Sequence, residues 1–395
     1  MNTIEKYPEP HFEAAIVGGG IAGLTVAIGL LSKGIRVKVF ERAEEFREIG
    51  AGIGLSPNAE RAMLALDPLV HATFRKLATL NTEDWFQYVN GYDKSPDGDG
   101  EEPLFKSCVN FNKELVAIDE EQDEDGRILL HFADGTWVKA DVVLGCDGVR
   151  SGVREYVLGI QDPASRPSYS HKFAFRGVVP MDKAVAAIGE KKALTRYMHL
   201  GPGGHVLTYP VAMGEMSNVV AFVTDPNDWP SEDKLTLPAS KEEALQYFVN
   251  FGPVVTAIMS LLDEKLDKWA PHHGAGAGFA IEDALVLAVA LEEAVRVVDN
   301  ELDKKTHAEI LRAALLSDEC IWYGRTRWLI ESSRFMGELY EWQVVECGSD
   351  PVRGQSETEW RSHKIWDYDI HRMVRETREI YALKIRDRWN KYTEQ

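Results

Sequence analysis

The feature that most constrains the fold is a glycine pattern near the start of the chain, Gly18-Gly-Gly20-Ile-Ala-Gly23. It directly follows residues 12–17, whose apolar and β-branched side chains predict a strand. A GxGxxG pattern between a strand and a helix is typical of a dinucleotide-binding turn. Gly18 permits the tight turn, Gly20 lets the backbone approach a pyrophosphate, and Gly23 allows the helix to pack closely on the strand.

The residues after these glycines complete the same unit. Residues 21–33 predict a helix whose N-terminal N–H groups point at the phosphates, and Gly34 ends that helix. Residues 36–40 predict a second strand, which is followed by Glu41. A carboxylate at this strand end can accept hydrogen bonds from ribose hydroxyls and disfavours a 2′-phosphate. The site therefore suits FAD or NAD.

Two further glycine-rich segments are suited to a flat ring system. Glycines at positions 50, 52 and 54 precede Pro57, which is a favoured first residue of a helix. Later, glycines at positions 274, 276 and 278 precede a second predicted helix. Backbone N–H groups in such a segment can approach the edge of a ring on which negative charge develops.

These segments resemble those of fungal group A FAD-dependent aromatic monooxygenases of the salicylate hydroxylase type. Members of this family have the p-hydroxybenzoate hydroxylase fold. The resemblance rests on residues 41–58, on Cys146-Asp147-Gly148 after an apolar run at 140–145, and on residues 271–284 with their Ile281-Glu-Asp-Ala284 ending. It implies an α/β fold in which a Rossmann-like FAD-binding domain is interleaved with an antiparallel-sheet substrate domain and followed by C-terminal helices. The implied division is 10–165 and 266–335 for the FAD-binding domain, 166–265 for the substrate domain and 336–395 for the C-terminal helical segment.

The resemblance also implies the cofactors. FAD would be the bound cofactor, while NADH or NADPH would act as a transient co-substrate, in agreement with the lack of a second dinucleotide pattern. The residues implied to contact FAD are Gly18, Gly20, Gly23, Glu41, Gly52, Gly54, Asp147, Gly276 and Ala277.

The substrate domain is predicted from strand-like runs at 172–180, 194–200, 205–211 and 218–224, separated by glycine and proline. Alternation places Phe173 and Phe175 on one face of the first strand and Arg176 on the other. A buried guanidinium needs an anionic partner, either in a structural salt bridge or in a bound phenolate or carboxylate. By resemblance, Arg176 and Tyr209 would hold the phenolate of the substrate.

The implied reaction is hydroxylation of a phenolic substrate by dioxygen. The reduced nucleotide would reduce the flavin, dioxygen would add to it as a flavin hydroperoxide, and the phenolate would attack the distal oxygen. The protein would orient the substrate and exclude water. The sequence leaves open which phenol is used, which of NADH and NADPH is preferred, and the oligomeric state.

Composition excludes several other classes. The net charge of −19, without a basic stripe, argues against a nucleic-acid partner. Residues 1–13 lack an apolar signal core, and the longest apolar run, 284–291, is too short to span a bilayer, so a cytoplasmic protein without a membrane span is expected. Four scattered cysteines without a CxxC pair argue against a metal site.

The chain departs from the family pattern at two places. An arginine-containing helix is missing after Lys106, and a strand with a Gly-Asp motif is missing after Ala270; both would contribute to FAD binding. A mistaken gene model, a splice variant and a decayed enzyme all remain open, so the alternative function is a catalytically silent relative. A second alternative, an NAD-dependent dehydrogenase, explains residues 18–41 but not 49–58 or 271–284.

Helices are expected in the C-terminal part of the chain, at residues 304–333 and 366–388.

Overall fold

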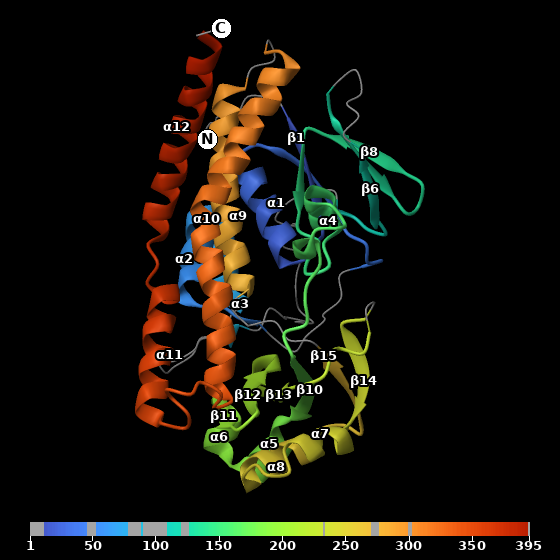
Figure 1. Cartoon of the computed structure of the whole chain (residues 1–395), viewed down its shortest axis with the longest axis vertical. Coiled ribbons are helices and arrows are strands. Elements are labelled where there is room, and N and C mark those ends of the chain that lie inside the picture. The colour runs from blue at the N-terminus through green and yellow to red at the C-terminus, as the bar shows by residue number, and fades with distance from the viewer. Residues whose placement is uncertain are drawn as a thin grey trace.

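The computed structural model describes residues 12–45, 53–77, 88–89, 109–119, 126–231, 234–269, 276–298 and 302–393. Figure 1 shows a parallel sheet with long helices in the upper part and an antiparallel sheet with short helices in the lower part. The long helix α10 (Lys304–Tyr340) runs beside both. The expected α/β fold with a second, antiparallel sheet is confirmed.

The parallel sheet forms around the strand that precedes the glycine pattern. Its order is β5-β2-β1-β9, and all neighbouring pairs are parallel. The strands are β1 (Glu13–Val17), β2 (Arg36–Phe40), β5 (Val109–Asn110) and β9 (Val142–Gly145). Within the described part of the chain, β9 is the last strand on its side of the sheet. The strands predicted at 12–17 and 36–40 are confirmed, and the run at 140–145 is divided between β9 and the end of β8.

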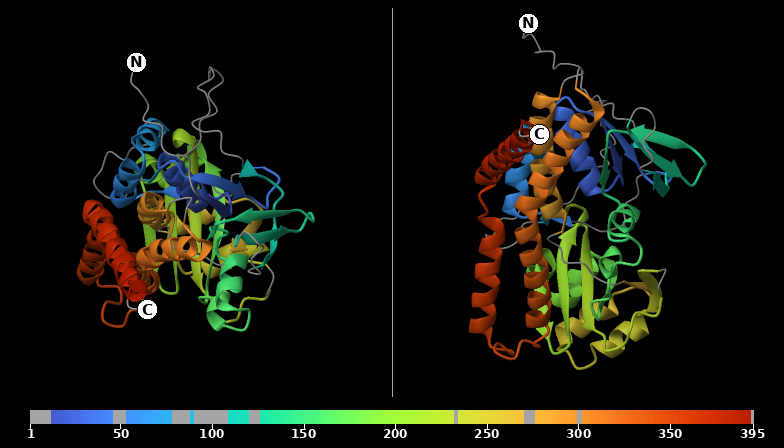
Figure 2. Two further views of the ribbon diagram at one scale, coloured as in Figure 1. Left: turned by 90° about the horizontal axis from the view of Figure 1, so that it is seen from above. Right: turned by 45° about the horizontal axis from the view of Figure 1, so that its top comes forward.

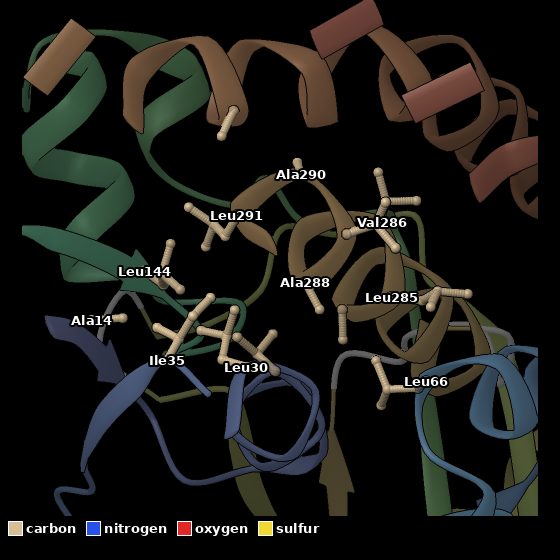
Figure 3. Close-up of a cluster of buried hydrophobic side chains, with 14 of the residues drawn as sticks. Ala14, Leu30, Ile35, Leu66, Leu144, Leu285, Val286, Ala288, Ala290 and Leu291 are labelled. Carbon is tan, nitrogen blue, oxygen red and sulfur yellow. The ribbon is translucent and has the colours of Figure 1, made fainter. Parts of the chain in front are cut away.

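The main core lies where α9 (Gly276–Val297) packs beside α1 (Ile21–Ser32) and α2 (Pro57–Leu66). In Figure 3 the side chains of α9 lie opposite Leu30 of α1 and Leu66 of α2. Buried residues occur on all sides of α9, as is typical of a helix enclosed by other elements. This enclosure accounts for the apolar run at 284–291. No helix in the described residues has the length and apolar character needed to cross a membrane.

The second sheet is antiparallel throughout and has the order β11-β12-β13-β10-β15-β14. Its strands are β10 (Lys172–Pro180), β11 (Tyr197–Gly201), β12 (Gly204–Val211), β13 (Met216–Thr224), β14 (Thr236–Ser240) and β15 (Lys265–Trp269). The four predicted runs are present, although the second one starts three residues later because Glu190–Leu194 forms helix α6. Strands β14 and β15 were not predicted, and β15 extends the sheet to residue 269.

Short helices cover one face of this sheet. They are α5 (Met181–Ile188), α6 (Glu190–Leu194), α7 (Lys241–Tyr247) and α8 (Pro253–Ser260). Phe173 and Phe175 belong to the core on this face, while Ala174 and Tyr209 belong to a separate small cluster on the other face. The alternation predicted for β10 is therefore confirmed. The face that carries Arg176 and Tyr209 is the one away from α5 and α8.

The remaining elements are smaller. A three-stranded antiparallel sheet, visible at the upper right of Figure 1, contains β6, β7 and β8. The bounds of these elements are β3 (Ile53–Gly54), β4 (Tyr88–Val89), β6 (Leu115–Asp119), β7 (Ile128–Phe132), β8 (Trp137–Ala140), α3 (Pro68–Leu77), α4 (Gly152–Leu158), η1 (Pro163–Ser165) and η2 (Ala212–Gly214).

The C-terminal helices differ from those expected. Helix α10 begins at Lys304, where Asp303 accepts a hydrogen bond from Thr306 N, and it continues to Tyr340 rather than ending near 333. The expected division at 335/336 therefore falls inside a helix. Trp366 ends a separate helix, α11 (Pro351–Trp366), and α12 (Ile370–Thr393) follows. Figure 2 shows α11 and α12 on the side of α10 away from the sheets.

We expect Leu285→Ala to lower the free energy of unfolding by about 2–5 kcal/mol, because it leaves a cavity between α9 and its neighbours. Leu285 is 1% exposed, whereas Leu64 on α2 is 48% exposed. Leu64→Ala is the matched control and should change stability far less. Urea unfolding followed by circular dichroism measures both variants. Equal losses for the two would contradict the central position of α9.

Candidate active site

The glycine turn has the geometry predicted for its first and last members. Gly18 has φ +105°, a left-handed backbone conformation, and a Cβ there would lie 2.2 Å from the carbonyl oxygen of Cys146. A Cβ on Gly23 would lie 1.9 Å from the carbonyl oxygen of Gly18. Larger residues at either position would separate α1 from the sheet. The turn and the close packing are confirmed, while direct contact with a cofactor stays a prediction.

The start of α1 is open and polar. Gly20 is the N-cap residue of α1; among the described residues, no side chain caps the helix there, and nothing lies within 4 Å of a Cβ on Gly20. Beside it, the Glu41 carboxylate accepts hydrogen bonds from Gly19 N at 2.6 Å and from Ala43 N at 2.8 Å. Helix N–H groups next to a strand-end carboxylate form a fitting receptor for a pyrophosphate and a ribose.

The two other glycine-rich segments meet at the starts of two helices. Gly54 lies in β3, three residues before α2 begins at Pro57, and Gly276 and Ala277 begin α9. A Cβ on Gly278 would lie 3.5 Å from both Ala59 Cβ and Ser56 Oγ, so the starts of α2 and α9 are adjacent. Gly52, residues 270–275 and the chain around Lys106 lie outside the described residues.

A buried polar network fixes these two helix starts, and sequence reasoning missed it. The carboxylate of Glu282 on α9 is fully buried and accepts a hydrogen bond from Nδ2 of Asn58 on α2. The same carboxylate accepts from Nε and Nη2 of Arg325 on α10, at 2.8 and 2.9 Å. Because a bidentate arginine–carboxylate pair is directional, the network sets the relative positions of all three helices.

We expect Arg325→Met to lower the free energy of unfolding by about 3–5 kcal/mol, because it leaves Glu282 buried without its cation. The surface pair of Arg327 and Glu331, with side chains 67% and 63% exposed, provides the control. Arg327→Met should cost no more than about 1 kcal/mol. Replacing both Glu282 and Arg325 by uncharged residues should restore part of the loss. Denaturant unfolding measures all three, and a mild effect of Arg325→Met would show that the pair does not hold the helices.

Asp147 has a local structural role at the start of α4. Its Oδ1 accepts from Ser151 Oγ at 2.5 Å, and its Oδ2 accepts from Gly152 N at 2.8 Å and Val153 N at 3.2 Å. Its carboxylate thus caps the start of α4, and contact of Asp147 with a cofactor stays a prediction. Arg154 donates to the carbonyl oxygens of Ser165 and Val149.

Cys146, beside the glycine turn, is a packed thiol. Burial raises its pKa to about 12, and the negative charges of Asp283 and Asp147 add to this effect. The thiol therefore stays protonated and unreactive at neutral pH. In the described parts of the chain, no three His, Cys, Asp or Glu side chains come together as a metal ion would require.

The antiparallel sheet brings together the two residues predicted to contact the substrate. Arg176 on β10 and Tyr209 on β12 lie on the same face, separated by the central strand β13. Asn218 of β13 lies between them, and its Oδ1 accepts from Arg176 Nε at 3.4 Å. Burial raises the pKa of Tyr209, while Arg176 and then Asn218 act in the opposite direction. Tyr209 is therefore a protonated hydrogen-bond donor at neutral pH.

The same face is tied to the end of α10 by a second buried network. The fully buried Glu341 carboxylate pairs with Lys172 of β10 and with His205 Nδ1 of β12, the latter at 3.2 Å, and accepts from Thr224 Oγ1. Burial raises the pKa of Glu341, but its hydrogen bonds from His205, Lys172 and Thr224 outweigh burial and leave the pKa lowered. Burial lowers the pKa of His205, and Glu341 opposes this only in part.

We expect stability to decrease as the pH falls from 7 to 4. His205 stays neutral in the fold, so the unfolded chain binds its proton more readily below the ordinary pKa of 6.5. The lowered pKa of Glu341 adds stability above its ordinary value of 4.5, and this stability is lost as pH falls through the folded value.

Glu341→Gln should therefore lower the melting temperature at pH 7 and flatten its dependence on pH below 4.5. The matched control is Glu331→Gln, at an exposed carboxylate. Thermal melts across this pH range measure both variants. An acid slope for Glu341→Gln equal to that of the unchanged protein would exclude the carboxylate as its source.

The comparisons with known proteins point to one family. Residues 16–47 match the family model of the NAD(P)-binding Rossmann-like domain. The "FAD-dependent monooxygenase pigN" of Monascus ruber is 48% identical, with 95% of this chain and 98% of that protein covered. The "Salicylate hydroxylase asL1" of Sarocladium schorii is 35% identical, with 97% and 93% covered. A solved "Salicylate hydroxylase substrate complex" has a TM-score of 0.75 at 25% identity and covers 93% of this chain and 98% of its own.

The lengths of these alignments bear on the segments that sequence analysis identified as missing. The alignment with the Monascus ruber protein runs over 431 residues, whereas this chain has 395 in total. This chain therefore lacks residues at several dozen positions where that relative has them. The alignment with the Sarocladium schorii protein is longer still, at 455 residues.

Proposed function

The chain belongs to the FAD-dependent monooxygenases of the salicylate hydroxylase type, and we propose that it hydroxylates a phenolic substrate using dioxygen and NADH or NADPH. The observation that carries this proposal is the placement of Arg176 and Tyr209 on one face of the antiparallel sheet, on either side of β13. A cation and a protonated phenol on the same face can form a receptor for an aromatic oxyanion.

The described residues fit the FAD that the family requires. The open start of α1 at Gly20 would receive the pyrophosphate, and Glu41 would accept hydrogen bonds from the ribose. Among the described residues, nothing lies within 4 Å of a Cβ on Gly276 either, at a helix start that lies beside α2. When bound, FAD supplies the redox chemistry that activates dioxygen, which no side chain can provide.

The side chains of the sheet would prepare the substrate. Arg176 would place positive charge beside the substrate oxygen and so favour the phenolate over the phenol. Tyr209 would donate a hydrogen bond to the same oxygen and fix the orientation of the ring. Leu207 and Val220, which pack in the same cluster, provide apolar surface that excludes water beside the ring.

A second candidate is a member that keeps the scaffold without turnover. Two observations favour it: the several dozen positions absent from this chain, and the location of β9 at the end of the described parallel sheet. A sheet edge without a neighbour leaves backbone hydrogen-bonding groups that need other partners. Retention of FAD distinguishes the two candidates.

We expect the purified protein to keep a flavin absorption spectrum after incubation with FAD and desalting, and phenols to stimulate its NAD(P)H oxidation with formation of hydroxylated product. Arg176→Leu should weaken binding of the phenol by about 10–100-fold, because hydrogen bonds to charged groups contribute about 1.5–3 kcal/mol. Tyr209→Phe should act in the same direction.

Tyr323→Phe, at a tyrosine that is 66% exposed on α10, is the matched control and should leave turnover unchanged. A colourless protein after reconstitution would favour the silent candidate. A flavin-loaded protein whose phenol binding is insensitive to Arg176→Leu would remove the proposed substrate site.

A further inference from the structure

Asn218 is a buried polar residue at the centre of the face that carries Arg176 and Tyr209. It is 0% exposed and is paired across the sheet with Tyr209 of β12 and Val178 of β10. Asparagine is depleted in strands. The residues that follow Asn218 in β13, from Val219 onward, are mostly apolar and buried, as in an ordinary interior strand. A β-branched or apolar residue would suit this position better if stability alone determined it.

The two ends of the Asn218 amide are directed at different groups. Its Oδ1 accepts from Arg176 Nε at 3.4 Å. Its Nδ2 is buried and has no hydrogen-bond partner within the described part of the chain. The amide nevertheless lies close enough to Tyr209 to oppose, after Arg176, the effect of burial on the pKa of that phenol. Asn218 thus acts on both groups of the receptor.

We propose that Asn218 is a positioning residue that aims Arg176 and Tyr209 at one substrate oxygen, an inference that rests on the proposed function. Its Oδ1 holds the Nε side of the guanidinium, which leaves the terminal N–H groups of Arg176 for the ligand. In the complex, its Nδ2 would donate to the oxygen of Tyr209, the residue paired with Asn218 across the sheet, so that the hydroxyl hydrogen turns away from the amide and toward the ligand. The ligand class is therefore an aromatic oxyanion.

The orientation of the amide explains why a residue with both a donor and an acceptor is needed. A leucine of similar size would leave Arg176 without its lateral partner and Tyr209 free to rotate its hydroxyl. An aspartate would keep an acceptor for Arg176 but would neutralise its charge and repel a phenolate. Asn218→Leu therefore tests the positioning of Arg176, whereas Asn218→Asp tests the positive charge that Arg176 offers to the ligand.

The test uses the full chain and 4-nitrophenol, whose phenol and phenolate forms absorb at different wavelengths. Difference spectra over a pH titration give both the affinity and the pKa of the bound ligand, and they require no turnover. We expect the unchanged protein to bind the phenolate and to lower the pKa of the ligand. Asn218→Leu should weaken phenolate binding about tenfold and return the pKa of the ligand toward its free value.

Asn218→Asp should remove the preference for the phenolate altogether. The control is Ser217→Ala, at a neighbouring buried residue whose side chain lies on the other face of β13, and it should behave as the unchanged protein. Thermal melts accompany each titration, because a purely structural role would lower the melting temperature without moving the pKa of the ligand. If Asn218→Leu does not fold, Asn218→Ala, which removes the amide without adding a charge, carries the test.

The outcomes separate this inference from the proposed function. If the unchanged protein shows no preference for the phenolate, the proposed substrate site fails and the role of Asn218 fails with it. If the unchanged protein prefers the phenolate and the folded Asn218 variants bind it equally well, Asn218 is not a positioning residue, while the proposed function stands.

Discussion

One buried carboxylate, Glu282, fixes the part of the molecule on which the candidate sites depend. Its carboxylate accepts hydrogen bonds from Asn58 and from Nε and Nη2 of Arg325. The guanidinium of Arg325 also lies 4.5 Å from the ring centre of Phe279 and 3.6 Å from that of Tyr368. A buried charge is costly unless its partners stay in place, so α2, α9 and α10 cannot shift independently. The glycine segments at the starts of α2 and α9 are positioned by the same constraint.

Helix α10 extends this constraint from one sheet to the other. It carries Arg325 in its second half and leads directly to Glu341, whose carboxylate is paired with Lys172 and His205 of the antiparallel sheet. Glu341 lies 16 positions after Arg325, which corresponds to about 24 Å of helix. Ionic contacts at both places on one rigid helix set the distance between the dinucleotide turn and the face that bears Arg176 and Tyr209.

Within the described residues, the parallel sheet ends at β9. Val142 and Leu144 of this strand are buried in the main core. The relatives contain residues at several dozen positions that this chain lacks. Membership of the family is therefore shown for this chain, whereas its loading with FAD stays a prediction.

The sequence by itself determined the features that arise from sterics and periodicity among near neighbours. These are the turn at Gly18, the close packing at Gly23, the start of α2 at Pro57 and the alternation of β10 that separates Phe175 from Arg176. Only the tertiary structure decided which distant groups meet: Glu282 with Arg325, Glu341 with Lys172 and His205, and Asn218 between Arg176 and Tyr209. It also revealed α11, which buries no residue fully and so has little apolar pattern to read, and β15, whose alternating charges resemble a surface segment. Local patterns record what one element needs, whereas hydrogen bonds between elements depend on how the whole chain brings them together.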